Sequence, residues 1–272
     1  MKKRFILLID FSEYTDNLIK YACDWSKQAN AELILVHQSI TLIPGFTDSE
    51  SRQKIVELNN NKDLQKLKEL AARLIPSTMK VSYLVSENHL QTLLTDLLAE
   101  PHENLIFAAI KGTGIIKQIF LGSFALEVIE NINNIIVAMP KEISVFSHEK
   151  IFVAITEKYP LNIIEFNRFL NFFENENTCI TFFYLAKPDE KTEGIEKQLN
   201  NLSILYADRF ETKTAIFKSN NPFEDIKKII NNKEKEILII QKGSRFFTDQ
   251  LFRLSLINEL VYEGQTPLII LP

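Results

Sequence analysis

Short continuous runs of apolar residues, each ended by a polar residue, recur along the whole chain. Phe5 to Ile9 is followed by Asp10, and Ile151 to Ile155 is followed by Thr156. Runs of this length without polar alternation are typical of parallel strands that are buried on both faces. The same pattern predicts strands at 31–37, 80–85, 105–112 and 135–140 in the first half, and at 178–184, 212–217, 237–243 and 267–272 in the second.

Apolar residues at helical spacing lie between these runs. In the first half, Leu18, Ala22 and Trp25 mark one face of a helix that should stop at Asn30. In the second half, Pro160 suits a first helical turn. The apolar face of that second helix is expected at Ile163, Phe166, Leu170 and Phe173, and amphipathic segments follow the third strands at 90–98 and 222–230.

The two halves repeat one order of elements, which predicts a duplicated domain. Strand–helix alternation of this kind demands right-handed crossovers and a sheet that is covered on both faces. We therefore predict an α/β fold of two tandem doubly wound domains, each with a five-stranded, mainly parallel sheet. The expected boundaries are 1–140 and 150–272, with 141–149 as the junction.

One segment, 41–74, is expected to belong to the first half alone. It begins around Pro44-Gly45 and continues as a charged helical stretch with leucines at helical spacing. It accounts for most of the length difference between the halves. Its role stays open, and a lid over a pocket is one interpretation.

Composition narrows the class of protein. The chain has 272 residues, of which 46% are hydrophobic and 24% charged, so it is expected to be globular rather than disordered. The net charge of −4 does not favour nucleic acid, which selects for a basic face. The first apolar run is too short for a signal peptide, and no run approaches the ~20 residues of a membrane span. Two isolated cysteines, Cys23 and Cys179, favour a reducing cytoplasm.

A glycine cluster follows the fourth predicted strand of the first half. Gly112, Gly114 and Gly122 are three of only seven glycines, and Gly122-Ser123 opens the next helix. Open parallel sheets bind ligands beyond the carboxyl ends of their strands, where glycines let backbone amides approach phosphates. The spacing is neither a Walker nor a Rossmann fingerprint. A phosphate loop and a tight structural turn therefore both stay open.

Taken together, these residues make the first half resemble a universal stress protein domain. Asp10-Phe11-Ser12 matches the Asp-x-Ser that follows the first strand in this family. Gly112, nine further residues and then Gly122-Ser123 match the second part of the family's glycine signature. The resemblance covers almost the whole chain as a tandem pair, and it implies an adenine nucleotide alpha hydrolase-like fold.

The resemblance also implies a ligand and the residues that would hold it. In ATP-binding members, the aspartate and the second-strand backbone hold the nucleoside, while the glycine loop and its serine hold the phosphates. Two departures weaken the match, because Ala109 replaces the first glycine of the signature and the bulky Phe124 follows Ser123. ATP, with Mg²⁺ accompanying its phosphates, would bind the first half only. The implicated residues are Asp10, Phe11, Ser12, Gln38 through its backbone, Ala109, Gly112, Gly122, Ser123 and Phe124.

The second half lacks this constellation. Thr156 stands where Asp10 stood, and Leu254-Ser255 replaces the Gly-Ser pair. Family domains often dimerise through their last strands, so the resemblance implies that the two halves pair within one chain. A homodimer of the whole chain stays open as a further assembly.

Three functional classes follow from these observations. The first is a stress-response protein that binds adenine nucleotide, and the second is a non-nucleotide-binding interaction or signalling module of the same fold. The third is an enzyme, which we do not expect because no general base or arginine finger is recognisable. No metal site is expected, because the histidines have no companions at metal-ligand spacing.

Single residues also carry alternatives. Asp10 can bind a ligand or cap the helix that follows it. Ser12 is expected to be the N-cap of that helix rather than a nucleophile, and His37 is expected to be structural. Cys23 is expected to be buried on the core face of the same helix.

Overall fold

The structure is a computed structural model that describes residues 1–109, 128–173, 177–218, 236–243 and 266–272. The first-half strands are β1 (Lys2–Leu8), β2 (Glu32–Gln38), β3 (Val81–Ser86), β4 (His102–Ala109) and β5 (Ile136–Met139). The second-half strands are β6 (Lys150–Ala154), β7 (Cys179–Ala186), β8 (Glu211–Lys218), β9 (Glu236–Gln241) and β10 (Leu268–Leu271). The helices are α1 (Thr15–Ala29), α2 (Ser49–Leu74), α3 (Leu90–Ala99), α5 (Ile163–Leu170) and α6 (Glu193–Tyr206).

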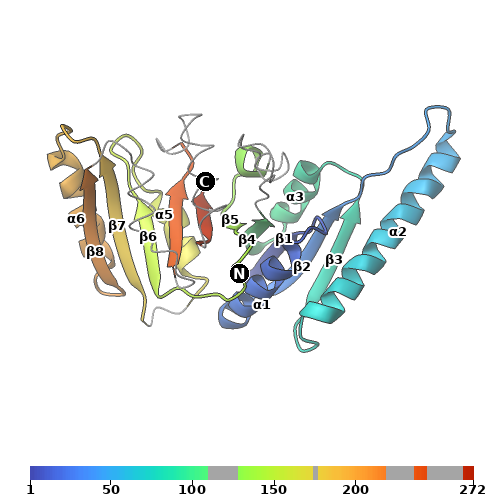
Figure 1. Ribbon diagram of the computed structural model, residues 1–272, viewed down its shortest axis with the longest axis horizontal. Helices are drawn as coiled ribbons and strands as arrows, with labels where there is room; N and C mark the ends of the chain where they lie inside the picture. Colours follow the sequence, from blue (N-terminus) through green and yellow to red (C-terminus); the bar gives the residue numbers. More distant parts are fainter. Residues whose placement is uncertain (110–127, 174–176, 219–235, 244–265) are drawn as a thin grey trace.

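All of these strands join one sheet, in the order β3-β2-β1-β4-β5-β10-β9-β6-β7-β8 (Figure 1). Neighbours are parallel except β5 and β10, which run antiparallel where the two halves meet. Each half therefore contributes five parallel strands in the same order, counted from the meeting point outward. The predicted fold class is confirmed, and the sheet fits two tandem domains.

The register at the meeting point is symmetric. Val137 pairs with Ile269, and the pairs on either side of it are Ile136 with Ile270 and Ala138 with Leu268. The register of β4 with β5 is the same as that of β9 with β10. Ile136 of the first half therefore corresponds to Leu268 of the second. Exchange of the two halves therefore maps this set of pairs onto itself. A two-fold axis between equal units requires such a register.

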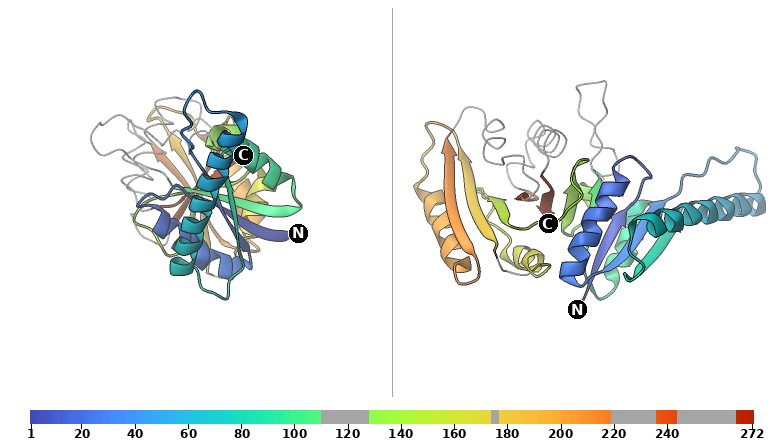
Figure 2. Two further views of the ribbon diagram at one scale, coloured as in Figure 1. Left: turned by 90° about the vertical axis from the view of Figure 1, so that its right-hand side faces the viewer. Right: turned by 60° about the horizontal axis from the view of Figure 1, so that its bottom comes forward.

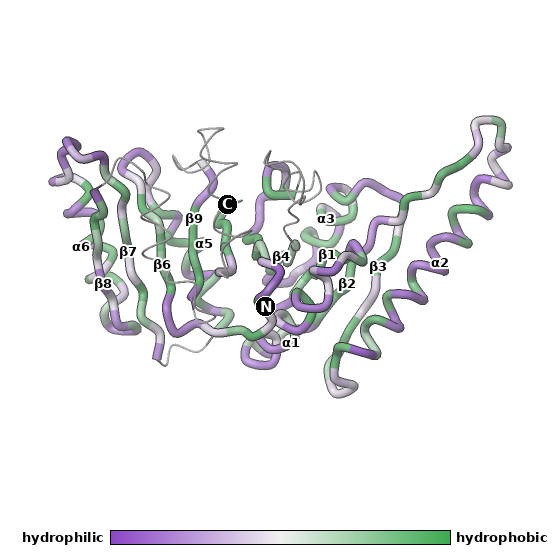
Figure 3. The backbone as a smooth tube through the Cα atoms, in the orientation of Figure 1, coloured by the Kyte–Doolittle hydropathy of each residue, from purple (hydrophilic) through white to green (hydrophobic). Residues whose placement is uncertain are grey.

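Both faces of the sheet are buried, which explains the continuous apolar runs. Successive strand residues point to opposite faces. Phe5 and Leu7 belong to one core cluster, and Ile6 and Leu8 belong to the other. Helices α1, α2, α5 and α6 cover the first cluster, and α3 covers the second (Figure 2). Figure 3 shows that the strands are mainly hydrophobic, whereas the helices carry both hydrophobic and hydrophilic residues.

The first core cluster crosses from one half to the other around Trp25. The indole stacks on Phe146 at a centroid distance of 4.3 Å, and its Nε1 donates to the Phe172 carbonyl at 2.9 Å. Phe5 of β1 lies 5.8 Å from the Phe172 ring. Lys3 adds a polar link, because its Nζ donates to the Asn171 carbonyl at 2.6 Å. The halves thus share a packed interior as well as a strand pairing.

The prediction that segment 41–74 belongs to the first half alone is wrong in part. Both halves carry a helix between their second and third strands, α2 in the first and α6 in the second. Helix α2 has 26 residues and α6 has 14, so the first half lengthens a shared element. The amino-terminal part of α2 extends past the carboxyl end of β3 (Figure 1). The buried residues of α6 recur at helical spacing, which is the signal that the sequence offered: Ile195, Leu199, Leu202 and Tyr206.

Helix α5 is shorter than the sequence predicted. It begins at Ile163, and Asn162 is its N-cap, whose side chain accepts from the Glu165 amide at 3.2 Å. Pro160 therefore precedes the helix instead of forming its first turn. The helix ends at Leu170, so Phe173 packs from the turn that follows it. The helix begins after Asn162 because this side chain caps it, and Asn162 lies closer in sequence to the apolar residues of the helix than Pro160 does.

Candidate functional site

The candidate site lies at the carboxyl edge of the first-half strands. Strand β1 stands between β2 and β4, and the chain turns to β2 and β3 on one side and reaches β4 and β5 on the other. The region beyond the carboxyl ends of β1 and β4 is therefore a topological switch point, where open α/β sheets bind ligands. Asp10 follows β1 at this point, and Ala109 ends β4 beside it.

Asp10 organises the turn that leads into α1. Its Oδ1 accepts from the Ser12 amide at 2.9 Å and from the Thr15 hydroxyl at 3.3 Å. The prediction that Ser12 is the N-cap is wrong, because α1 begins at Thr15 and its N-cap is Tyr14. The Ser12 hydroxyl instead accepts from the Tyr14 amide at 3.4 Å. The carboxylate thus holds the turn before the helix, which is a capping role displaced by a few residues.

Phe11 has an unusual backbone conformation. Its φ is 54°, in the left-handed region that costs a bulky residue about 1 kcal/mol or more. Its ring packs on the imidazole of His37 at a centroid distance of 4.6 Å. The ammonium of Lys66, from α2, lies 5.4 Å from the centre of the same ring. The strained turn, the end of β2 and the middle of α2 therefore meet at Phe11.

His37 is held from both sides of its ring. Nδ1 lies 2.7 Å from the Ile9 carbonyl, and a carbonyl only accepts, so this nitrogen carries the proton. Nε2 faces Asp63 Oδ2 at 3.6 Å. The other Asp63 oxygen accepts from Lys66 at 2.8 Å. This geometry agrees with the predicted structural role of His37 and links β1, β2 and α2.

Further polar contacts fix α2 along this edge. The Ser39 hydroxyl donates to Asn60 Oδ1, and Asn59 Nδ2 donates to the Thr41 hydroxyl at 3.3 Å. Only Leu67 and Ala71 of the helix are buried. The middle of α2 is therefore attached mainly through side-chain hydrogen bonds and charges, beside the candidate site.

Lys141 places a positive charge at the same edge, just after β5. Its ammonium lies 2.8 Å from a carboxylate oxygen of Glu13, and its carbonyl accepts from Asn17 Nδ2 at 2.8 Å. The hydrogen bond to Glu13 raises the pKa of Lys141, and the charges of Glu13 and Glu142 add to this. The ammonium therefore stays protonated across the physiological range.

The remaining predicted residues divide into two groups. Gln38 ends β2, where it pairs with Ser86 of β3, and Ala109 pairs with Met139 of β5. The loop residues lie outside the described part of the chain: Gly112, Gly122, Ser123 and Phe124. The sequence interpretation did not place Asp63 and Lys66 at the site. Their spacing of three residues on one helix face was the available signal.

The corresponding edge of the second half is built differently. The Ile9 amide donates to the Val36 carbonyl at 2.8 Å, and the Ile155 amide donates to the Phe183 carbonyl at 2.8 Å, so the two turns correspond. Thr156 then occupies the position of Asp10. Its hydroxyl donates to the Tyr159 carbonyl at 3.1 Å and accepts from the Tyr159 amide at 3.3 Å. In the second half, a neutral hydroxyl whose hydrogen bonds stay within its own turn therefore replaces the carboxylate of Asp10.

Neither a metal site nor a membrane span is found in the described ranges. No three or more of their His, Cys, Asp and Glu residues are grouped to hold a metal ion. None of the described helices combines the length and the apolar character needed to cross a membrane.

Cys23 is expected to react slowly with thiol reagents. It is buried on α1, and burial raises the pKa of its thiol to about 11. At pH 8 only about one such thiol in a thousand is ionised, and the thiolate is the reactive form. We expect the Cys179→Ser variant, which keeps Cys23, to react with Ellman's reagent about 100-fold more slowly in the folded state than in urea. Equal rates in the two states would show that Cys23 is accessible.

The chain is similar in sequence to one protein family and in fold to several solved structures. Residues 1–136 match the family model described as the universal stress protein family. No curated protein matches the chain. A universal stress protein from Archaeoglobus fulgidus DSM 4304 has a similar structure, with a TM-score of 0.69 and 14% identity over 98% of this chain and 97% of that one.

Two further solved structures resemble the chain over nearly its full length. One is described as a functionally unknown protein from Pseudomonas aeruginosa PAO1, with a TM-score of 0.57 and 13% identity over 99% of this chain and 92% of that one. The other is the cytoplasmic domain of a prokaryotic cation chloride cotransporter, with a TM-score of 0.53 and 11% identity over 99% and 95%. At such identities the likeness concerns the fold.

Proposed function

Because the chain belongs to the universal stress protein family, we propose that it is a stress-response protein whose first half binds ATP at the carboxyl edge of β1, β2 and β4. The observation that carries this proposal is the position of Asp10. It follows β1 at the switch point of the strand order, which is where open α/β sheets bind their ligands. The carboxylate offers hydrogen-bond acceptors to a nucleoside at that point.

The surroundings of Asp10 suit parts of a nucleotide. Phe11 and His37 present aromatic rings at the edge, and Lys141 presents a protonated ammonium. Aromatic rings stack on bases, and ammonium groups attract phosphates. Mg²⁺ would come with the phosphates as their counter-ion, since the described acidic residues form no metal-binding group of their own. We propose no catalytic step for these residues.

We further propose that the chain is a tandem of two domains, 1–140 and 150–272, and that the second serves as the built-in partner of the first. The symmetric pairing of β5 with β10 and the repeated strand order support this arrangement. Thr156 in the place of Asp10 supports a second domain without nucleotide. Both cysteines are free thiols, which suits a cytoplasmic protein.

A second candidate function rests on the same edge. Phe11, His37 and Lys66 pack together where a nucleoside would lie, and α2 is attached over them. An edge closed by its own side chains favours an interaction module that binds no nucleotide.

Titration of ATP by calorimetry separates the two functions. We expect the wild-type chain to bind, and Asp10→Ala to weaken binding about tenfold or more, because a hydrogen bond to a charged group is lost. Thr156→Ala makes a matched truncation at the corresponding position of the second half and should leave the affinity unchanged.

Three results would contradict the proposal. Absence of heat at millimolar ATP would favour the interaction module. An equal loss in Asp10→Ala and Thr156→Ala would remove the assignment to the first half. ATP turnover that disappears in Asp10→Ala would show an enzyme. A thermal melt of each variant shows whether a lost affinity reflects unfolding, since removal of a capping carboxylate costs about 1 kcal/mol.

A further inference from the structure

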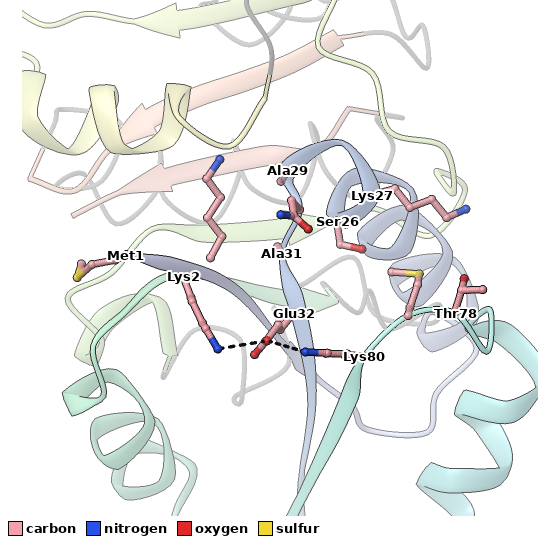
Figure 4. Close-up of a pocket in the computed structure, with 12 residues that line it drawn as sticks. Met1, Lys2, Ser26, Lys27, Ala29, Ala31, Glu32, Thr78 and Lys80 are labelled. Atoms are coloured by element: carbon pink, nitrogen blue, oxygen red, sulfur yellow. Dashed lines mark ion pairs between the residues drawn. The ribbon is translucent and has the colours of Figure 1, made fainter.

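A recess lies at the edge of the first half opposite Asp10, beyond the amino ends of β1, β2 and β3 (Figure 4). Its volume is about 700 Å³, which is within the usual range of small-molecule pockets. Four lysines line it together with one carboxylate: Lys2, Lys3, Lys27, Lys80 and Glu32. The recess is thus strongly positive in a chain whose net charge is −4.

Three of these residues form an ion cluster on neighbouring strands. Glu32 of β2 lies between Lys2 of β1 and Lys80, which precedes β3, and its Oε1 is 3.9 Å from each ammonium (Figure 4). A separation of 3.9 Å is longer than a hydrogen bond, so the ammonium protons stay available to a ligand. The side chains of Lys2 and Lys80 are 74% and 86% exposed. Glu32 therefore holds two accessible cations near each other without neutralising both.

The other two lysines have different surroundings. Lys3 donates to the Asn171 carbonyl and so belongs to the contact between the halves. Lys27 stands in the last turn of α1 and points away from the ion cluster (Figure 4). The carbonyl end of a helix repels anions, and Lys27 offsets that effect. An anion is therefore best placed on the strand side of the recess, against Lys2 and Lys80.

The second half shows that the fold does not require these charges. The strand registers put Glu149 at the position that corresponds to Lys3, and Glu211 at the position that corresponds to Lys80. The same sheet edge thus accepts carboxylates at two of the positions that are lysines in the first half. The positive charge is therefore specific to this recess, and the fold itself does not require it.

We propose that this recess binds a compact oligophosphate group, with Lys2 and Lys80 contacting neighbouring phosphates. Such a group carries several negative charges within a few ångströms, which matches two ammonium groups that share one carboxylate. The group could be a free inorganic oligophosphate or the phosphate tail of a nucleotide. This site goes beyond the proposed ATP site, because it lies at the other edge of the sheet from Asp10.

Calorimetric titration of the full chain with sodium tripolyphosphate at low ionic strength tests the proposal. We expect wild type to bind and the double variant Lys2→Gln/Lys80→Gln to bind about tenfold more weakly, because two charge-assisted contacts are lost. The control Lys187→Gln/Lys191→Gln removes the same charge from an exposed stretch of the second half and should bind as wild type does. Asp10→Ala should also bind tripolyphosphate as wild type does.

Two kinds of result would overturn the proposal that the recess binds oligophosphate. Absence of binding to wild type, or an equal loss in the control pair, would overturn the proposal. Wild-type affinity in Lys2→Gln/Lys80→Gln would overturn it too, because the phosphates would then be held elsewhere, for example beside Lys141 at the carboxyl edge.

A parallel titration with ATP in the Asp10→Ala background identifies the source of the phosphates. Competition of ATP with tripolyphosphate in that background supports a nucleotide tail as the ligand. Tripolyphosphate binding that ATP does not disturb supports a free oligophosphate. Since Asp10→Ala weakens only the carboxyl-edge site and Lys2→Gln/Lys80→Gln changes only the recess, failure of the proposed ATP site and failure of this recess give different results.

Discussion

Replacement of Trp25 by alanine is expected to destabilise the protein by about 4 kcal/mol, the usual cost of truncating a large buried aromatic residue. Trp25 is fully buried and stacks on Phe146 at 4.3 Å. Its edge meets Phe5 of the first half at 5.4 Å and Phe169 of the second at 6.0 Å. Its Nε1 also donates to the Phe172 carbonyl. The substitution therefore leaves a cavity and an unsatisfied carbonyl between the two halves.

Urea unfolding followed by circular dichroism measures this loss, since Trp25 is the chain's single tryptophan and its fluorescence disappears with it. The variant Trp25→Phe serves as the control. It keeps a ring in the cluster and loses the hydrogen bond, so it should fall between wild type and Trp25→Ala. Because the indole contacts both halves, wild type should unfold in one transition. Two transitions, with only one of them shifted by Trp25→Ala, would contradict the shared core.

Replacement of Ile269 by aspartate is expected to cost about 5 kcal/mol or more, which places it among the most destabilising single changes. Ile269 of β10 is fully buried and pairs with Val137 of β5 at the centre of the junction. A carboxylate at this position would be desolvated among aliphatic side chains of both halves. The change therefore acts on the strand pairing and on the core beneath it.

The matched control is Ile269→Val, which removes one methylene and should cost about 1 kcal/mol. Both variants are measured by the urea midpoint of the full chain. If Ile269→Asp left the midpoint near that of Ile269→Val, the β5–β10 pairing would not be an integral part of the folded core. A first half that unfolded at the wild-type midpoint in Ile269→Asp would show that it folds independently of the junction.

The strands could be predicted from the sequence because their signal is local. Runs such as Phe5 to Ile9 lie in a sheet that buries both faces, so every position is apolar and the run is visible without tertiary information. Helix α1 was equally clear, and its C-cap is Asn30, in the left-handed conformation that asparagine tolerates. Helix α6 was missed although its four buried residues recur at helical spacing, because the exposed Ile204 and Leu205 blur its apolar face.

The candidate site was only partly predictable. Asp10 could be placed at the carboxyl edge, because it directly follows an apolar run. The sequence left ligand binding and capping both open for Asp10. That its carboxylate caps the turn before the helix, with Tyr14 instead of Ser12 as the N-cap, is decided by the backbone geometry. The contact of Phe11 with His37 and Lys66 joins three elements that lie far apart in the sequence.

The residues alone were enough to assign the alternation of strands and helices, the family, and the contrast between Asp10 and Thr156 at corresponding positions. The symmetric register of β5 with β10, and the position of Lys2 and Lys80 on either side of Glu32 at the amino edge, became visible only in the folded chain. Burial selects apolar residues at the period of each helix or strand, so this pattern is visible in the local sequence. Strand order and edge contacts arise when crossovers bring distant segments together, and their energies depend on neighbours that the local sequence does not specify.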